Sequence, residues 1–152
     1  MRPEAFSDLK LNNMARVEHI GIAVKSLSES IPLFEKLLNT KHYKVESVAS
    51  EGVNTAFLLQ NGTKLELLES VGPEGIIAKY IERKGEGMHH IAFEVDDIIA
   101  EMVRLKDAGF VLLNHEPKKG ADNKLVCFVH PKDTNGVLIE LVMDRNKNES
   151  PG

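Results

Sequence analysis

The sequence predicts an α+β fold in which two repeated β-α-β-β-β modules form a curved mixed sheet around one shared site. Three observations lead to this fold class. Two strand-like segments each carry a central histidine, His19 and His90, 71 residues apart (90 − 19). Each half also contains an Asn-Gly turn that is followed, four residues after the glycine, by Glu66 or Glu140. A helical pattern lies between these features in both halves, so the chain repeats one structural unit.

The first module is predicted to span residues 14–70, after an N-terminal extension over residues 1–13. Alternating apolar residues and turn signals predict its strands at 17–24, 45–48, 53–59 and 63–68. The last two of these strands flank Asn61 and Gly62, a dipeptide that favours the tight turn of a β-hairpin.

One helix is predicted between the first two strands, with an apolar stripe that ends at Leu38. Ser26 and Glu29 have the spacing of a capping box, which starts the helix at Ser26. This start places Pro32 inside the helix. A cap at Ser28 would instead place Pro32 in the first turn, where its missing N–H costs little.

The second module is predicted to span residues 86–144, after a connecting helix at 76–82. Its strands are predicted at 88–95, 111–113, 125–129 and 137–142. Its helix covers 98–108 and ends at Gly109, the residue type that helices favour directly after their last turn. Together the modules form a single domain at 14–144, followed by a flexible polar tail at 145–152.

The composition excludes several classes of protein. The net charge of −4 disfavours a nucleic-acid binder, which would need a basic face. No apolar run approaches the ~20 residues that span a membrane, and residues 1–13 lack the apolar core of a signal peptide. Cys127 is the single cysteine, which excludes a disulfide framework and a cysteine-based zinc site. We expect a cytoplasmic protein that binds neither nucleic acid nor membrane.

Side-chain alternation along a strand indicates which residues share a face of the sheet. His19 falls on one face with Gly21, which leaves space beside the imidazole. In the second half His90 falls on a face with Ala92. His89 falls on the opposite, apolar face, so we expect it to have a structural role or to support His90.

The paired histidines and glutamates indicate one shared metal site. Glu66 and Glu140 lie centrally on short, otherwise apolar strands, where a carboxylate is costly to bury unless it is paired or bound to a metal. Mixed nitrogen and oxygen ligands suit Zn, Mn, Co, Ni or Fe(II). A single histidine on a strand is more often a satisfied polar residue than a ligand, but four matched positions in matched elements favour a common role. The other histidines have no repeat partner and are expected at the surface or in loops: His42, His115 and His130.

Several longer motifs resemble the vicinal oxygen chelate superfamily, which contains glyoxalases, bleomycin-resistance proteins and dioxygenases. The motifs are M-A-R-V-E-H-I-G-I-A-V at 14–24, G-E-G-M-H-H-I-A-F-E-V-D-D at 85–97 and H-P-K-D-x-x-G-V-L-I-E-L at 130–141. Within the superfamily they are most similar to the methylmalonyl-CoA epimerases, and the resemblance covers residues 14–144. It implies the paired-module glyoxalase fold around a metal and an isomerase that interconverts the epimers of methylmalonyl-CoA.

The resemblance also implies the composition of the site. Carried over by motif, the metal ligands are His19, Glu66, His90 and Glu140, and the metal is a divalent ion such as Co, Mn, Zn or Ni. Glu140 would in addition act as a catalytic acid–base group at the α-carbon of the acyl-CoA substrate. Some relatives carry a further glutamate where this chain has Thr55, so the second acid–base group stays open. A homodimer is implied by the resemblance alone.

Two alternative functions remain. A glyoxalase I-type lactoylglutathione lyase would use the same metal and similar chemistry, and a small-molecule-binding protein of the bleomycin-resistance type would use no metal. The four intact candidate ligands disfavour the metal-free alternative. Lysines late in the second half could contact the phosphates of CoA, although a solvated loop explains them equally well: Lys118, Lys119, Lys124 and Lys132.

Overall fold

The computed structural model describes residues 15–146 and contains one eight-stranded mixed sheet. The predicted extension at 1–13 and the tail after residue 146 lie outside the described residues. The first module consists of β1 (Arg16–Ala23), α2 (Leu27–Leu38), β2 (Lys44–Val48), β3 (Val53–Gln60) and β4 (Thr63–Ser70). The second consists of β5 (Gly87–Glu94), α4 (Ile98–Asp107), β6 (Lys118–Lys119), β7 (Lys124–Val129) and β8 (Ile139–Asp144). The predicted α+β class with two β-α-β-β-β modules is therefore confirmed.

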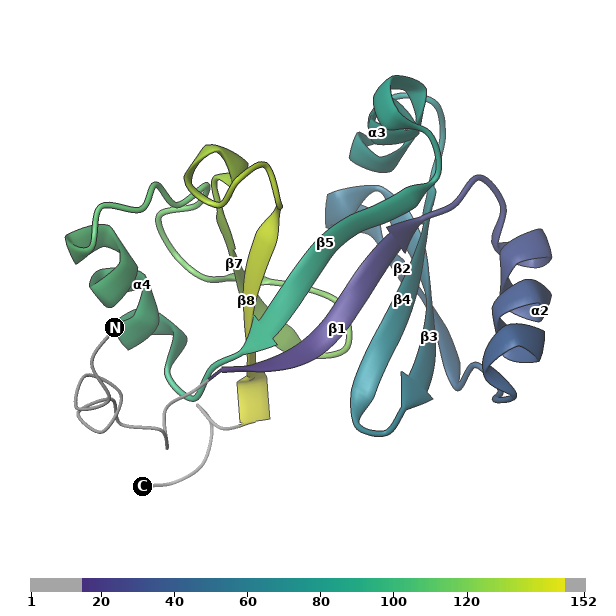
Figure 1. Cartoon of the computed structure of the whole chain (residues 1–152), viewed down its shortest axis with the longest axis horizontal. Coiled ribbons are helices and arrows are strands. Elements are labelled where there is room, and N and C mark those ends of the chain that lie inside the picture. The colour runs from purple at the N-terminus through teal and green to yellow at the C-terminus, as the bar shows by residue number, and fades with distance from the viewer. Residues whose placement is uncertain (1–14, 147–152) are drawn as a thin grey trace, which may run out of the picture.

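The two modules join through their first strands. The strand order is β2-β3-β4-β1-β5-β8-β7-β6, with β1 antiparallel to β5, while β1 is parallel to β4 and β5 is parallel to β8. Exchanging the modules reverses this order without changing any pairing. The sheet therefore has an approximate twofold symmetry, and β1 and β5 run side by side through the middle of the molecule (Figure 1).

The helix α2 begins with Ser26 as its N-cap, and the alternative start at Ser28 is wrong. The Ser26 side chain accepts a hydrogen bond from the backbone N–H of Glu29, as in the predicted capping box. Pro32 lies inside the helix, where it cannot donate to the carbonyl of Ser28. Ser28 is exposed, so water can satisfy that carbonyl. The helix ends at Asn39, which adopts the left-handed conformation of a C-cap.

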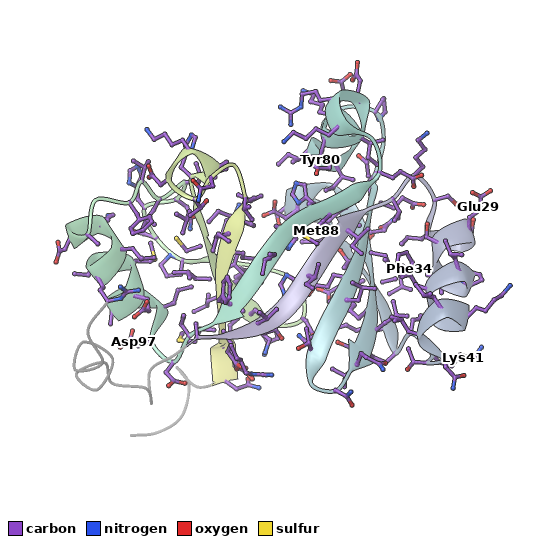
Figure 2. All side chains as sticks on the ribbon, in the orientation of Figure 1. Glu29, Phe34, Lys41, Tyr80, Met88 and Asp97 are labelled. Atoms are coloured by element: carbon purple, nitrogen blue, oxygen red, sulfur yellow. The ribbon has the colours of Figure 1, made fainter. Side chains whose placement is uncertain are left out.

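The helices α2 and α4 cover one face of the sheet and leave the other face free for a site. Under α2 the buried side chains of β3 and β4 are Ala56, Leu58 and Leu67, and under α4 those of β7 and β8 are Cys127, Val129, Leu141 and Met143. Figure 2 shows Phe34 directed from α2 toward the sheet. Because side chains alternate along a strand, the residues between these positions face the opposite side.

The connecting helix α3 (Ile76–Lys84) lies beside the start of β5 and the end of β1 (Figure 1). Ile77 packs against Ala23 and Leu68, and the hydroxyl of Tyr80 donates a hydrogen bond to the carbonyl of Met88, 2.6 Å away. The helix is thereby fixed to β5 directly beside the histidine pair. Within residues 15–146, no helix is long and apolar enough to cross a membrane.

The predicted strand at 111–113 does not form. Leu112 makes one isolated bridge to Val129, and the regular edge strand of this module is β6. The pairing stops because the side chain of Asn114 replaces the backbone: its Oδ1 accepts the N–H of Phe128 at 3.0 Å. A polar side chain that bonds the neighbouring backbone competes with a strand ladder in this way.

Candidate metal centre

A cavity of about 300 Å³ lies on the face of the sheet that α2 and α4 leave uncovered. The four predicted ligands all line it: His19 on β1, Glu66 on β4, His90 on β5 and Glu140 on β8. Each is at least 93% buried, since the most exposed of them retains 7% of its accessible surface. Each module supplies one histidine from its first strand and one glutamate from its last.

The candidate ligands lie in two rows of paired residues that run across neighbouring strands. In each row a small residue lies between two ligands. In the first row Gly21 pairs with Glu66 on one side and with His90 on the other. A Cβ atom on Gly21 would lie 2.2 Å from Cε1 of His90, so the imidazole occupies the space that a side chain would take. Glycine is therefore required at this position for His90 to lie over β1.

In the second row Ala92 takes the corresponding place. It pairs with His19 on β1 and with Glu140 on β8, and it is completely buried. Ala92 follows His90 by two residues in the second module, as Gly21 follows His19 in the first. The space that the sequence predicts beside His19, over Gly21, is therefore filled by the imidazole of the other module.

Three donor atoms converge at the centre of the cavity. Nε2 of His19 lies 2.9 Å from Nε2 of His90, and Oε1 of Glu140 lies 3.0 Å from the first nitrogen and 3.1 Å from the second. This buried oxygen has no properly oriented hydrogen-bond partner among the described residues. Adjacent ligands held about 2.1 Å from an octahedral ion are about 3 Å apart. The donor set and its spacing therefore fit a divalent cation.

Glu66 lies outside this triangle. Its Oε2 is 3.1 Å from Nδ1 of His19, on the opposite side of the imidazole from Glu140. Glu18, His19 and Glu66 form a second group of close donors. That group is a poorer cation site, because the ammonium of Lys64 already lies 2.7 Å from Glu18.

Glu18 is a site residue that the sequence pattern missed. Its side chain is 3% exposed, and its Oε1 lies 2.7 Å from Nδ1 of His19. Strict alternation would place Glu18 under α2, but β1 has a bulge at this point in its pairing with β5. A β-bulge turns one side chain to the opposite face. The signal that could have found it is the repeat: Glu18 precedes His19 as His89 precedes His90.

The prediction that His89 lies on the apolar face is wrong for the same reason. β5 has its own bulge beside the pair of Gly21 and His90, and His89 lines the cavity. Its Nδ1 lies 2.9 Å from Nδ1 of His90, and its ring packs edge-on against Tyr80. Burial and the neighbouring His90 lower the pKa of His89 to about 4, so the ring is neutral near pH 7.

The buried charges favour a cation at the centre. Burial alone would lower the pKa of His19, but the carboxylates of Glu140, Glu18 and Glu66 raise it well above its ordinary value. Burial alone would raise the pKa of Glu140, but its contacts with the two imidazoles lower it. Burial raises the pKa of Glu66. The site therefore stabilises positive charge between its carboxylates.

The outer part of the cavity contains further polar residues. Thr55 on β3 is 1% exposed and lines the wall. Glu51, from the short turn Ala49–Glu51 before β3, also lines the wall and forms an ion pair of 3.0 Å with Lys118. Of the four lysines considered for CoA, Lys118 and Lys124 line the cavity.

Asp122 fastens the loop between β6 and β7 to the first module. Its Oδ1 is 2.6 Å from Nζ of Lys44, and its Oδ2 is 2.7 Å from Nζ of Lys64. Lys64 also contacts Glu18, so one ammonium joins this loop to the side chain beside His19. Burial alone would raise the pKa of Asp122, but the two lysines lower it to about 2.

Replacing Asp122 with asparagine is expected to lower the free energy of unfolding by about 1–2 kcal/mol at pH 7. Because the folded-state pKa lies below the ordinary value of about 3.9, the contribution is complete above that value and disappears as the pH falls toward 2. Urea unfolding of the parent and of Asp122→Asn between pH 2 and 7 measures the difference. Asp107→Asn, at an exposed carboxylate outside this group of ion pairs, is the control.

The molecule consists of two modules, each with one strand, one helix and three further strands, which join around buried histidines and glutamates. This arrangement defines a class of proteins in which two modules share a central site of candidate metal ligands. The chain belongs to the Glyoxalase/Bleomycin resistance protein/Dioxygenase superfamily, whose family model matches residues 18–128. This match confirms the family that the motifs predict.

Individual relatives agree with this assignment. The chain is 40% identical over 130 residues to an ethylmalonyl-CoA/methylmalonyl-CoA epimerase of Cereibacter sphaeroides, covering 84% of this chain and 97% of that protein. It is 38% identical over 130 residues to the mitochondrial methylmalonyl-CoA epimerase of Homo sapiens, covering 85% and 74%. A solved variant of Streptomyces coelicolor methylmalonyl-CoA epimerase, in complex with 2-nitronate-propionyl-CoA, superposes with a TM-score of 0.83 at 33% identity, covering 87% and 96%.

Proposed function

We propose that this protein catalyses the interconversion of the epimers of methylmalonyl-CoA. The observation that carries the proposal is the convergence of His19, His90 and Glu140 in a buried cavity, where Oε1 of Glu140 makes no properly oriented hydrogen bond with the described residues. The similarity to methylmalonyl-CoA epimerases over most of the chain supports the choice of substrate. The protein is accordingly an isomerase that acts on an acyl-CoA.

His19, Glu66, His90 and Glu140 would hold a divalent metal, for which Co, Mn, Zn and Ni all suit the nitrogen and oxygen donors. When bound, such an ion would stabilise negative charge on an oxygen of the substrate. The α-proton of methylmalonyl-CoA lies between a thioester and a carboxylate, and its removal creates an enolate. A site that concentrates positive charge at its centre therefore matches the charge that the reaction develops.

Glu140 is the group that we expect to exchange a proton with the α-carbon. Its carboxylate is ionised, because the two imidazoles lower its pKa, and its Oε1 makes no properly oriented hydrogen bond with the described residues. Epimerisation also needs a second group that acts on the opposite face of the enolate. Glu51 is the one carboxylate among the described cavity residues outside the four ligands, so it is our candidate.

The wall of the cavity supports an anionic substrate. Lys118 and Lys124 line it, and we propose that their ammonium groups contact the phosphates of CoA. The homodimer and the cytoplasmic location implied by the family resemblance are further parts of the proposal. Size-exclusion chromatography with light scattering tests the first, and fractionation of source cells tests the second.

The test of the reaction is α-proton exchange of methylmalonyl-CoA in deuterated water. The purified protein is stripped with a chelator and assayed with and without added Co²⁺ or Mn²⁺. We expect deuterium incorporation, together with epimer interconversion, that depends on the added metal. Absence of exchange by folded, metal-loaded protein would refute the proposal, and turnover of a glutathione hemithioacetal would then identify a lactoylglutathione lyase. A protein that holds no metal would instead be a binding protein.

A further inference from the structure

The two bulges of the central strand pair are equivalent in the two modules. On β1 the extra residue is Glu18, directly before His19, and on β5 it is His89, directly before His90. The same 71-residue offset that relates the histidines relates the two bulged residues (89 − 18). Each module has therefore placed a second polar side chain on the cavity face of its first strand, where regular alternation would have placed it on the helix face.

Each bulged residue contacts the same atom of the histidine that follows it. Oε1 of Glu18 lies 2.7 Å from Nδ1 of His19, and Nδ1 of His89 lies 2.9 Å from Nδ1 of His90. The Nε2 atoms of His19 and His90 face each other and Glu140. In both modules the bulged residue lies beside Nδ1 of the histidine, and Nε2 points to the centre. In the first module Oε2 of Glu66 also lies 3.1 Å from Nδ1 of His19.

We propose that Glu18 and His89 are positioning residues that orient the two imidazoles for metal binding. A neutral imidazole carries one N–H, and an acceptor beside Nδ1 keeps the proton there and leaves the Nε2 lone pair free for a metal. An acceptor behind a ligand histidine also holds the angle of the ring and raises its basicity. The inference rests on the metal site of the proposed function, but it does not depend on the substrate.

The surroundings of each bulged residue hold it in this role. The second oxygen of Glu18 lies 2.7 Å from Nζ of Lys64, which in turn contacts Asp122. Both carboxylate oxygens are therefore engaged, and the adjacent ammonium opposes the use of Glu18 as a ligand in its own right. His89 is held by the ring of Tyr80, whose centroid is 4.8 Å from its own.

The test is the affinity of the metal-free protein for Co²⁺, measured by chelator competition, together with the visible absorption spectrum of the bound ion. Glu18→Leu and His89→Phe remove the nearest partner of each Nδ1 atom while keeping similar bulk, and the phenyl ring keeps the contact with Tyr80. Oε2 of Glu66, 3.1 Å from Nδ1 of His19, remains in Glu18→Leu. Each of the two substitutions is expected to weaken Co²⁺ binding by about 10–100-fold and to alter the spectrum. Glu18→Gln and His89→Asn retain an acceptor oxygen and should recover most of the affinity.

A residue that acts only on folding would lower stability without changing the affinity of the folded protein. Thermal unfolding of each metal-free variant is therefore measured beside its affinity. Glu94→Ala, which removes an ion pair with Arg16 at the far end of the same two strands, is the matched control and should bind Co²⁺ like the parent. Affinities within about twofold of the parent in folded Glu18→Leu and His89→Phe would overturn the proposal.

A second measurement needs no variant. Nitrogen-15 spectra of the histidine rings in the Zn²⁺-loaded protein should show both ligand imidazoles protonated at Nδ1 and bound through Nε2. Binding through Nδ1 in either ring would overturn the proposal even if the variants failed to fold. Since neither experiment involves an acyl-CoA, loss of the proposed reaction would leave this result standing, and unchanged metal affinity would leave the reaction standing.

Discussion

Glu140→Gln is expected to lower the rate of α-proton exchange by about 10³-fold. The amide cannot accept the proton that the carboxylate takes, and positioned acid–base groups contribute about 10²–10⁴-fold. The variant keeps the volume of the side chain and one oxygen that faces the two imidazoles. Deuterium incorporation into methylmalonyl-CoA, followed by mass spectrometry at saturating Co²⁺, measures the loss of the chemical step separately from any loss of metal.

The matched control is the same substitution in the other module. Glu66 is equally buried and occupies the same position of its strand, but its oxygen lies beside Nδ1 of His19 and outside the triangle of converging donors. Glu66→Gln retains an oxygen ligand, so we expect it to keep metal binding and most of the exchange rate. Equal losses in Glu66→Gln and Glu140→Gln would assign Glu140 to metal binding alone.

His90→Ala is expected to weaken divalent metal binding by at least about 100-fold. It removes one of three converging donors and leaves a void over Gly21, into which the ring now fits. Loss of a supporting contact behind a ligand already costs about 10–100-fold, and loss of the ligand itself should cost more. The measurement is the metal content after dialysis against limiting Co²⁺, with the fold checked by circular dichroism.

His115→Ala controls for the loss of an imidazole. His115 is exposed and has no equivalent in the other module, so its removal should leave metal content unchanged. The loss of metal in His89→Phe should be larger than in His115→Ala and smaller than in His90→Ala. A His90→Ala protein that is folded and retains metal like the parent would contradict the assignment of His90 as a ligand.

The sequence predicts most of the fold because its signals are local and occur twice. Asn61 and Gly62 both adopt positive φ in the turn where the hairpin was predicted, and Gly109 does so after α4. The strand at 111–113 was wrong, because the side chain of Asn114 takes over the pairing with β7. That competition depends on a contact between residues 14 positions apart, which the alternation within the segment 111–113 does not reveal.

The sequence predicts the four candidate metal ligands, but it does not predict the two residues that contact the ligand histidines. His19, Glu66, His90 and Glu140 follow from the repeat, and they meet because their strands β4, β1, β5 and β8 are the four nearest the twofold axis of the sheet. The positions of Glu18 and His89 could be predicted only with knowledge of the two bulges. Each extra residue shifts the alternation of side chains between the two faces of the strand. A bulge has no distinct composition, and only the pairing of β1 with β5 reveals it.

The division of the donors between the modules has a consequence for how such a protein could arise. A chain of half this length would carry one histidine, one glutamate and one extra strand residue, and two copies associated through their first strands would build a complete symmetric centre. Once the copies are fused into one polypeptide, the sequence of each half can change independently of the other. The carboxylate before one histidine and the imidazole before the other mark where the halves of this chain have diverged.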